Sequence, residues 1–456
     1  TKEINRLLNK FNSVAKIEIA LKKTKFAWQE KSGAVNLSSG DSCFDNWLRW
    51  VNIQPILRKI FGCSFLPDFD YGKGGRGWRD LWQDCLGLIL NSPREARSLL
   101  LNNFSGVRID GSNATIVGKK PGEFIADRND IARVWMDHGI WPLVTTELYI
   151  NESGDADILF KESDYFCDQH IWRSAKINRD WLAQSGDRLK TKAGKVYRGS
   201  IYEHLLAQNL TQFFNVGPHN HIRLEGADWN DGLDMAKESG ESIAFSAMYA
   251  QNLNKLAELL LKTGRRSILL AEEMKCLIKD LNYNNIKEKR KILEGYFAKI
   301  EKNISGKKIA VDVKTLARGL KAKSFWISEH IRKKEWLKEG FFNGYYDNQK
   351  KRVEGKREGL LKMSLTSQVF PIMSGVADGT QVSRIIKSVE KHLLDKKLKG
   401  YRLNTNFQGE QHHLGRAFSF SYGDKENGAI FSHMVVMYAY ARYSRGFVEE
   451  GWRILR

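Results

Sequence analysis

A tryptophan and two aspartates stand within five residues in the segment Asp228-Trp229-Asn230-Asp231-Gly232. The flat face of an indole can stack on a sugar ring, and the lower polarity beside it raises the pKa of a neighbouring carboxylic acid. Asp231 could then hold a proton near neutral pH and donate it to a departing glycosidic oxygen. The same residues could instead form an Asx turn or an N-cap, and the segment alone favours that structural role.

A second segment, residues 76–84 (RGWRDLWQD), interleaves arginines, tryptophans and carboxylates. Guanidinium groups match the oxygens of phosphate or carboxylate in a two-pronged way, and Asp or Gln side chains suit sugar hydroxyls. The glycine-rich residues 72–75 before it do not form a Walker loop, because no Gly-Lys-Ser/Thr follows. The structural alternative is a helix start that carries an ion pair between Arg79 and Asp84.

A third segment runs from Lys425 through Asn427 and Gly428 to His433 (KENGAIFSH). If a helix begins near Gly428, its free N–H groups and positive end favour a bound anion. Lys425 and His433 could add charge and hydrogen-bond donors to the same pocket. A single histidine on an apolar helix is otherwise more often a core residue whose hydrogen bonds are satisfied.

Further polar residues precede or end a predicted helix: Asp137, His138 and Trp141 in WMDHGIW, then Tyr149 and Asp155. An acid close to two tryptophans could contact a sugar. The interpretation favoured for this group is the simpler one, in which they are ordinary polar residues at helix ends.

The elements that must position these segments are mainly helices. Apolar residues recur at helical spacing in residues 242–263, and Gly264 follows as a helix end. Residues 378–394 and 428–443 are also predicted to be helical, and the basic stretch 275–338 is predicted to form a helical hairpin on the surface. Helices that carry polar loops at one end favour an all-α barrel with its site on the loop face.

The composition limits the classes of protein to which this chain could belong. The chain has 456 residues, of which 42% are hydrophobic, and it lacks a run of 18 apolar residues, so we expect no membrane partner. It opens with TKEINRLLNKF, without a leader, which suggests a fragment or a trimmed product. The cysteines form no C-x-x-C pair, so a cytoplasmic setting without a metal is expected. They are Cys43, Cys63, Cys85, Cys167 and Cys276.

The formal net charge of +20 favours anionic partners, among them nucleic acid and phosphate. The alternative is that much of this charge lies on solvated helix surfaces. A nucleic-acid-binding protein would bind less tightly as salt rises, and the tryptophan and arginine segments give that class no support. We therefore expect no nucleic-acid partner.

Five segments in order resemble glycoside hydrolase family 94, the cellobiose phosphorylase family: RGWRDLWQD, ELYINESGD, ADWNDGLD, SQVFPIMSGVA and KENGAIFSH. They span roughly residues 65–445. FFNGYYDN (341–348) and GYRLNTNF (400–407) are most similar to β-1,2-oligoglucan phosphorylases. The resemblance implies an (α/α)6 barrel over residues 1–456 and inverting phosphorolysis of a β-glucan, such as a β-1,2-oligoglucan or cellobiose, to α-glucose 1-phosphate.

The resemblance also implies roles for individual residues. Asp231 falls on the general acid of the family. Phosphate would act as a co-substrate, and no cofactor is implied. The other implied positions are Trp229, Asp84 and Lys425 for the sugar, Arg79 for phosphate and the donor sugar, and His433 for phosphate, with His412 or His413 as a second phosphate-binding histidine. Asp80 and Asp137 are further candidates for binding the sugar, from their residue types alone.

Chemistry also favours phosphorolysis over hydrolysis. An inverting hydrolase needs a second carboxylate to activate water, whereas phosphate is already a nucleophile that cations can place. Because Glu225, Asp228 and Asp234 crowd the segment around Asp231, counting carboxylates leaves a catalytic base open.

Two departures from the family pattern remain. From the residues before position 60 and after His433, we expect the given sequence to lack the N-terminal β-sandwich domain of the family and its later Thr-Gly phosphate loop. A non-catalytic glucan-binding barrel is therefore the main alternative, and a homodimer is one expected assembly.

Overall fold

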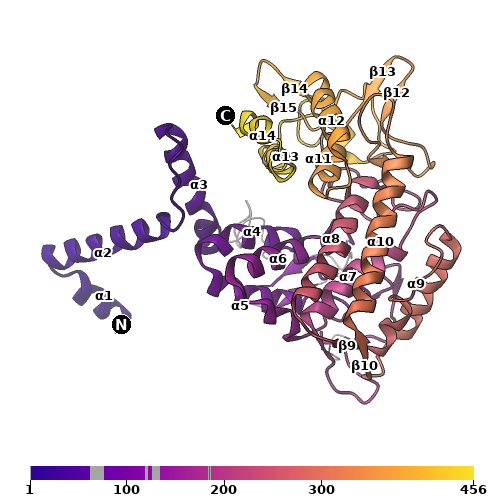
Figure 1. Ribbon diagram of the computed structural model, residues 1–456. Helices are drawn as coiled ribbons and strands as arrows, with labels where there is room; N and C mark the ends of the chain where they lie inside the picture. Colours follow the sequence, from indigo (N-terminus) through magenta and orange to yellow (C-terminus); the bar gives the residue numbers. More distant parts are fainter. Residues whose placement is uncertain are drawn as a thin grey trace. The chain divides into compact units, whose positions relative to one another are not determined.

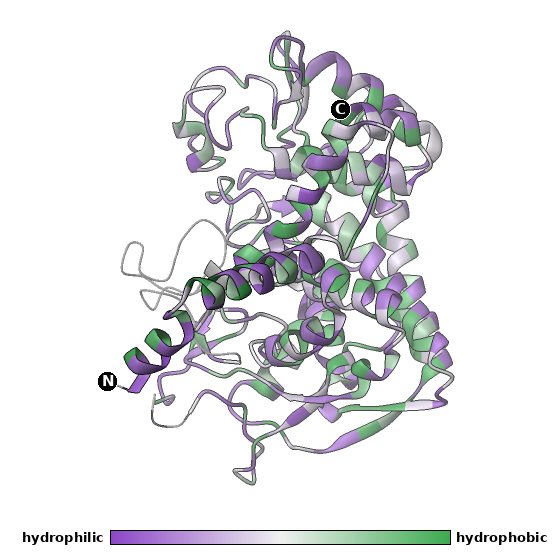
Figure 2. Ribbon diagram, turned by 90° about the vertical axis from the view of Figure 1, so that its left-hand side faces the viewer, coloured by the Kyte–Doolittle hydropathy of each residue, from purple (hydrophilic) through white to green (hydrophobic). Residues whose placement is uncertain are grey.

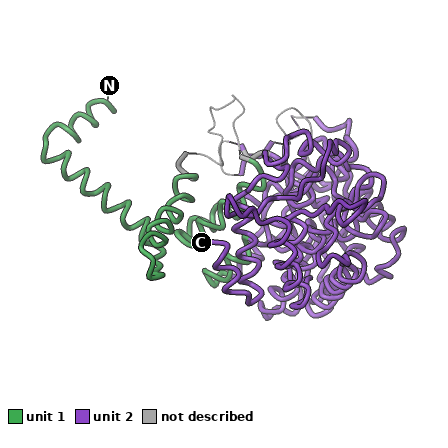
Figure 3. The backbone as a smooth tube through the Cα atoms, turned by 90° about the horizontal axis from the view of Figure 1, so that it is seen from above, with its two compact units in different colours: residues 1–100, 145–155 green, residues 101–144, 156–456 purple. Residues whose placement is uncertain are grey.

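The computed structural model describes residues 2–61, 76–118, 122–125, 134–182, 184 and 186–455, and most of its elements are helices (Figure 1). The prediction of a helical fold is confirmed, while the closed barrel stays a prediction. The chain divides into two compact units, one of residues 1–100 and 145–155 and one of residues 101–144 and 156–456 (Figure 3). The glycine-rich residues 72–75 singled out above lie outside the described residues.

The smaller unit is built from helices alone in its described part, apart from β1 (Arg76–Gly77). Its core lies on α4, which buries Trp78, Leu81, Trp82 and Cys85. The first two helices bury no residue. The helices are α1 (Lys2–Phe11), α2 (Val14–Ser32), α3 (Ser42–Phe61), α4 (Trp78–Asn91) and the parts of α5 (Pro93–Phe104) and α6 (Trp141–Ser153) that fall in this unit.

The larger unit is organised around α8, whose residues are buried along nearly its whole length. It packs against α7, α10 and α11, and α13 packs in turn against α11 and α14. Figure 2 shows hydrophobic and hydrophilic residues mixed along the helices. The helices are α7 (Ile201–Phe214), α8 (Ile243–Lys262), α9 (Ile286–Ile300), α10 (Val313–Lys334), α11 (Thr366–Met373), α12 (Gly379–His392), α13 (Ser432–Ser444) and α14 (Val448–Leu455).

Short antiparallel strand pairs join these helices in the larger unit. The longest pair connects β9 to β10, with Leu269 opposite Ala310. The pairs are β2 (Ile116–Val117) with β3 (Phe124–Ile125), β4 (Glu162–Asp164) with β7 (Arg198–Ser200), β5 (His170–Ile171) with β6 (Lys176–Ile177), β8 (Glu241–Ser242) with β11 (Tyr345–Tyr346), β9 (Ser267–Ala271) with β10 (Lys308–Asp312), β12 (Gly355–Arg357) with β13 (Leu360–Lys362), and β14 (Leu394–Asp395) with β15 (Gly400–Tyr401).

Two predicted helices are confirmed, and local capping explains both. Ser242 accepts a hydrogen bond from the backbone N–H of Phe245 and begins α8, and Gly264 follows that helix with a φ of 69°. Asp378 begins α12 through a capping box with Gln381.

The predicted helix start at Gly428 is wrong. This glycine has a φ of 78° and follows a turn in which Asn427 donates to the carbonyl of Asp424, so α13 begins only at Ser432. A left-handed glycine interrupts a helix rather than starting one.

The surface hairpin predicted for residues 275–338 is also wrong. The strand β10 separates α9 from α10, and α10 packs along α8. Lys289 and Lys323 are buried, with the Lys289 ammonium 4.3 Å from the Phe213 ring centroid and 3.9 Å from that of Trp326. Burial lowers the pKa of Lys289 to about 6 and that of Lys323 to about 8, so these two lysines do not carry the solvated charge that the sequence predicted.

Within the described residues, no helix combines the length and the apolar character that crossing a membrane requires.

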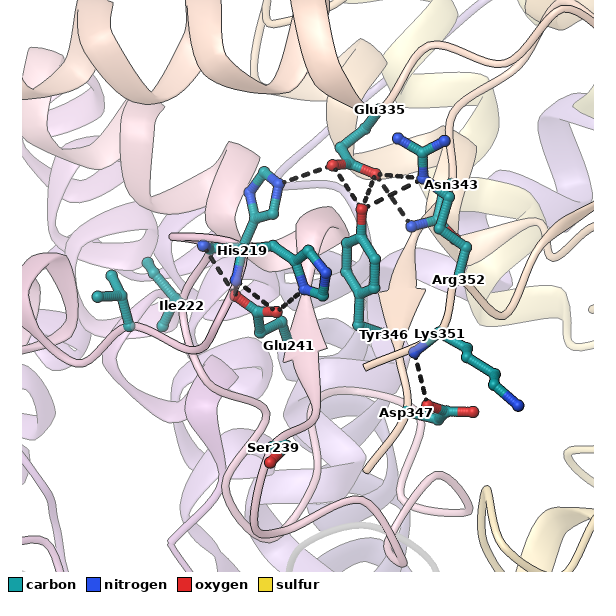
Figure 4. A network of polar contacts seen from close by, with 12 residues as sticks. His219, Ile222, Ser239, Glu241, Glu335, Asn343, Tyr346, Asp347, Lys351 and Arg352 are labelled. Atoms are coloured by element: carbon teal, nitrogen blue, oxygen red, sulfur yellow. Dashed lines mark hydrogen bonds and ion pairs between the residues drawn. The ribbon is translucent and has the colours of Figure 1, made fainter. Parts of the chain in front are cut away.

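A polar network ties the end of α10 to the strand pair β8–β11 (Figure 4). The Glu335 carboxylate, which is 1% exposed, lies 3.0 Å from Nε2 of His221 and accepts hydrogen bonds from the Tyr346 hydroxyl at 3.0 Å and the Asn343 amide at 3.1 Å. Arg352 adds a charge 3.4 Å away. Burial raises the pKa of Glu335, but the hydrogen bonds and charges, led by His221, outweigh it and bring the pKa to about 2.

This network should stabilise the fold above about pH 4 and lose that effect in acid. The pKa of Glu335 is lower in the folded chain than the value of about 4.3 of an unfolded one, so the stabilisation disappears as pH falls from about 4 towards 2. Its size is on the order of 3 kcal/mol. We expect urea denaturation of Glu335→Gln to show a flatter pH dependence than the parent chain over that window. The surface variant Glu258→Gln should keep the parent slope, and an equal slope in Glu335→Gln would contradict the assignment.

Candidate active site

Two successive Asx turns shape residues 228–232, which we call the acid loop. The backbone N–H of Asn230 donates to Oδ1 of Asp228 at 2.9 Å, and that of Gly232 donates to Oδ1 of Asn230 at 3.1 Å. Oδ2 of Asp228 accepts from the Ser242 hydroxyl at 2.8 Å, which ties the loop to the start of α8. Asp228 is completely buried, and burial raises its pKa to about 7. The structural alternative is therefore confirmed for Asp228.

The segment 414–417 supports the acid loop through backbone contacts. The N–H of Ala417 donates to the carbonyl of Gly232 at 3.0 Å, and the N–H of Met235 donates to that of Leu414 at 3.4 Å. Gly415 has a φ of 149°, and a Cβ there would collide with the Gly232 carbonyl. Two glycines at this crossing let the chains approach closely.

Asp231 lines a cavity of about 960 Å³, and it is the one acid-loop residue among the lining residues that the structure describes. The volume falls in the range typical of small-molecule sites. Its lining contains both aromatic and charged side chains. The aromatic ones are Trp135, Trp172, Phe214 and Phe297, the cationic ones Arg173, Arg223, Lys237, Arg290, Lys350 and Arg416, and the acidic ones Glu225, Asp231, Asp234, Glu238 and Glu294.

A buried ion pair forms part of the cavity wall. Nε of Arg173 lies 2.7 Å from Oε1 of Glu225, and Nη2 donates to Oε2 at 2.8 Å. Gln212 and Asn215 donate to the same carboxylate. Burial lowers the pKa of Arg173, but the charge of Glu225 outweighs it and raises the pKa, so the guanidinium stays charged.

The carboxylates that crowd Asp231 in the sequence are each engaged elsewhere. Glu225 holds Arg173, Asp228 anchors the acid loop, and Asp234 lies 3.3 Å from Nη1 of Arg416. The structure thus gives each of these three carboxylates a bonding role of its own, which the sequence left open.

Trp229 and His433, both predicted site residues, lie in contact. Their ring centroids are 5.5 Å apart in an edge-to-face arrangement, and Phe431 lies on the same indole at 6.3 Å. Trp229 belongs to the acid loop, and His433 is the second residue of α13. The fold therefore joins two segments that are some 200 positions apart.

Lys425 and His412 lie in the turns that precede α13. Lys425 has a φ of 45°, and its ammonium lies 4.7 Å from the Phe420 ring centroid. The His412 ring is exposed, with Nε2 2.7 Å from the Glu410 carboxylate and Nδ1 3.2 Å from the Ser419 hydroxyl. In this structure the His412 imidazole thus pairs with an acid.

Asp137 lies in the short helix η2 (Met136–Gly139) and is completely buried. It accepts a hydrogen bond from the indole N–H of Trp141 at 2.8 Å. In the smaller unit, Asp155 accepts from the Tyr149 hydroxyl at 2.9 Å and from Nε of Arg97 at 2.7 Å. These contacts agree with the favoured interpretation of Tyr149 and Asp155 as structural residues.

Arg79, Asp80 and Asp84 lie on α4 of the smaller unit, which begins after Gly77. Asp84 forms an ion pair with Arg58 of α3 at 2.6 Å. This partner, 26 positions earlier, was not predicted from the sequence.

Sequence reasoning missed several residues of the cavity. Trp172, Arg173 and Ser174 carry no recognised motif, and Arg290 was assigned to a surface hairpin. The spacing of 52 positions between Arg173 and Glu225 offers no local signal. Among the described residues, no group of three or more His, Cys, Asp or Glu side chains is placed to hold a metal ion.

The family model described as "Glycosyl hydrolase 94 superfamily, catalytic domain" matches residues 27–455. A cyclic β-(1,2)-glucan synthase from Rhizobium meliloti is 22% identical over 96% of this chain and 13% of its own length. A solabiose phosphorylase from Paenibacillus borealis is 22% identical over 84% of this chain and 38% of its own length. A cellobionic acid phosphorylase from Neurospora crassa is 20% identical over 81% and 37% respectively. The chain thus spans 13% to 38% of the length of these relatives.

Proposed function

This chain belongs to the catalytic-domain family of the glycosyl hydrolase 94 superfamily, and from that premise we propose that it cleaves a β-glucoside with inorganic phosphate. The reaction would invert the anomeric carbon and release α-glucose 1-phosphate. Two relatives named as phosphorylases support the reaction type. The relative named for β-(1,2)-glucan supports a β-1,2-oligoglucan as the first substrate to try.

The observation that carries the proposal is the position of Asp231. It stands on the rigid acid loop and lines a cavity of about 960 Å³. In the proposed reaction Asp231 donates a proton to the glycosidic oxygen while phosphate attacks the anomeric carbon from the opposite face. The leaving sugar departs with that proton, and the donor glucose becomes α-linked to phosphate.

The other roles are proposed from the family resemblance. Trp229 would provide a stacking face for the donor sugar, and its contact with His433 supports a phosphate near that sugar. We also propose that the helices close into an (α/α)6 barrel and that the chain can act as a homodimer. The remaining proposed contacts are Arg79 and His412 with phosphate, and Asp80, Asp84, Asp137 and Lys425 with the sugar.

The test measures glucose 1-phosphate released from β-1,2-glucooligosaccharides and from cellobiose, with and without inorganic phosphate. We expect release only with phosphate, and faster from the β-1,2-linked series. Free glucose at equal rates with and without phosphate would identify a hydrolase. Binding of the oligosaccharide without release of either product would support the glucan-binding alternative.

A further inference from the structure

The cavity wall contains a run of backbone in the left-handed conformation. Trp172, Arg173 and Ser174 have φ values of 56°, 52° and 63°. Residues other than glycine rarely adopt this conformation. Three of them in succession persist only where contacts with neighbouring residues hold the backbone. Strain of this kind tends to gather at sites that bind or transform a ligand.

The same three residues carry polar atoms that lack a partner. Nε1 of Trp172, Nη1 of Arg173 and Oγ of Ser174 are buried and form no hydrogen bond with the part of the chain that the structure describes. Buried polar groups are almost always paired, so each exception points to an absent partner. All three residues line the cavity that contains Asp231.

Named contacts fix this segment in place. The backbone N–H of Arg173 donates to Oδ2 of Asp110 at 2.6 Å, and its guanidinium is held by Glu225. The Lys176 ammonium lies 3.2 Å from the Trp172 ring centroid. The three polar groups are therefore positioned before any ligand arrives, which lowers the entropic cost of binding.

We propose that Trp172, Arg173 and Ser174 bind the sugar unit that leaves in the proposed reaction, by donating hydrogen bonds to its oxygen atoms. That the bound sugar is the leaving group rests on the proposed function. Two N–H groups and one O–H group match the acceptor oxygens of a sugar ring. Glu225 balances the charge of Arg173, so this part of the wall suits neutral hydroxyls better than a free anion.

The residues that line the cavity favour the leaving side of the reaction over the donor side. Asp231 shares the cavity with residues 172–174. Trp229 and His433, proposed above for the donor sugar and phosphate, are not among the described lining residues. The glycosidic oxygen joins both sugars, so it is the lack of these two donor-side residues in the described lining that assigns the cavity to the leaving sugar.

The test uses substitutions that each remove one hydrogen-bond donor and keep most of the side-chain volume. Trp172→Phe and Ser174→Ala each delete one donor, whereas Arg173 is left intact because it pairs with Glu225. Trp181→Phe is the matched control. Among the described residues, Nε1 of Trp181 is also buried without a hydrogen-bond partner, but Trp181 does not line the cavity. The probe is sophorose, the β-1,2-linked diglucoside, titrated by calorimetry into the 456-residue chain and its variants.

We expect each of the two cavity variants to bind sophorose about 3- to 10-fold more weakly, the effect of one lost hydrogen bond. Trp181→Phe should stay within about 2-fold of the parent chain. In the synthetic direction, the KM for the acceptor sugar should rise by the same factor while the KM for glucose 1-phosphate is unchanged. Circular dichroism checks that each variant is folded.

The outcomes separate this proposal from the proposed function. Sophorose binding that is equal in the parent chain and both variants, or absent in all, would overturn the site at residues 172–174. If the variants weaken binding but the parent releases no glucose 1-phosphate, the sugar site stands and the phosphorylase proposal fails. If the parent chain releases glucose 1-phosphate in the presence of phosphate and the variants bind sophorose like the parent, the phosphorylase proposal stands and the sugar site at residues 172–174 fails.

Discussion

Asp231→Asn is expected to lower the rate of phosphorolysis of a β-1,2-glucooligosaccharide by about 100-fold to 10,000-fold. Positioned general acids contribute roughly this factor. Asparagine keeps the size of the side chain and its hydrogen-bonding capacity, but its amide does not transfer a proton to the leaving oxygen. Asp228, Asn230 and Ser242 hold the acid loop through hydrogen bonds that Asp231→Asn leaves unchanged, so we expect the loss to fall mainly on the chemical step. The measurement is the initial rate of glucose 1-phosphate release.

Two comparisons distinguish loss of a proton donor from loss of structure. Asp234→Asn alters a neighbouring cavity carboxylate that pairs with Arg416, and we expect its rate to fall by no more than about 10-fold. An aryl β-glucoside with a nitrophenolate leaving group needs little protonation, so Asp231→Asn should retain most of its rate on that substrate. Equal losses on both substrates would exclude Asp231 as the acid.

Glu225→Gln is expected to lower the free energy of unfolding by about 3–5 kcal/mol. Removing one partner of a buried ion pair leaves the other charge without compensation. The Arg173 side chain is 5% exposed, and both its Nε and Nη2 point to Glu225. The amide of glutamine would also replace an acceptor of Gln212 and Asn215 by a donor group. Urea denaturation followed by circular dichroism measures the effect.

The matched control is the half-exposed pair of Arg416 and Asp234. Arg416→Met should cost no more than about 1 kcal/mol, the usual value of an exposed ion pair. The double variant Arg173→Met with Glu225→Leu should recover much of the stability lost in Glu225→Gln, since it leaves no buried charge unpaired. A Glu225→Gln chain within about 1 kcal/mol of the parent would show that water compensates Arg173.

Helices whose ends are marked by local chemistry could be predicted from the sequence. Ser242 and Asp378 sit where a side-chain oxygen can accept a backbone N–H of the first turn, and the apolar residues that follow recur at helical spacing. Such signals lie within a few residues of the position they determine.

Elements that depend on distant partners could not be predicted in this way. The strand β10 forms against β9, whose residues stand some 40 positions earlier, so the basic stretch resembled an unbroken helical hairpin. Lys289 and Lys323 resemble solvated lysines until Phe213 and Trp326 are brought beside them. At these residues, contacts with distant parts of the chain decide the structure, and the local composition does not.

The same contrast between local signals and distant partners applies to the candidate site. The acid loop could be predicted from the sequence, because an acid next to a tryptophan already indicates sugar stacking and proton donation. Residues 172–174 could not, because nothing in a tryptophan, an arginine or a serine marks a left-handed backbone. The roles assigned to Arg79, Asp84 and His412 stay predictions, since they were drawn from the family pattern alone.

The backbone support of the acid loop has an evolutionary consequence. Main-chain N–H and C=O groups at Gly232, Met235, Leu414 and Ala417 carry the contacts, and almost any residue type supplies those groups. Selection can therefore hold the geometry of the acid while other side chains around it drift, provided that Gly232 and Gly415 keep the close crossing open and Asp228, Asn230 and Ser242 keep their hydrogen bonds. Lineages whose sequences have diverged far apart can in this way inherit the same loop.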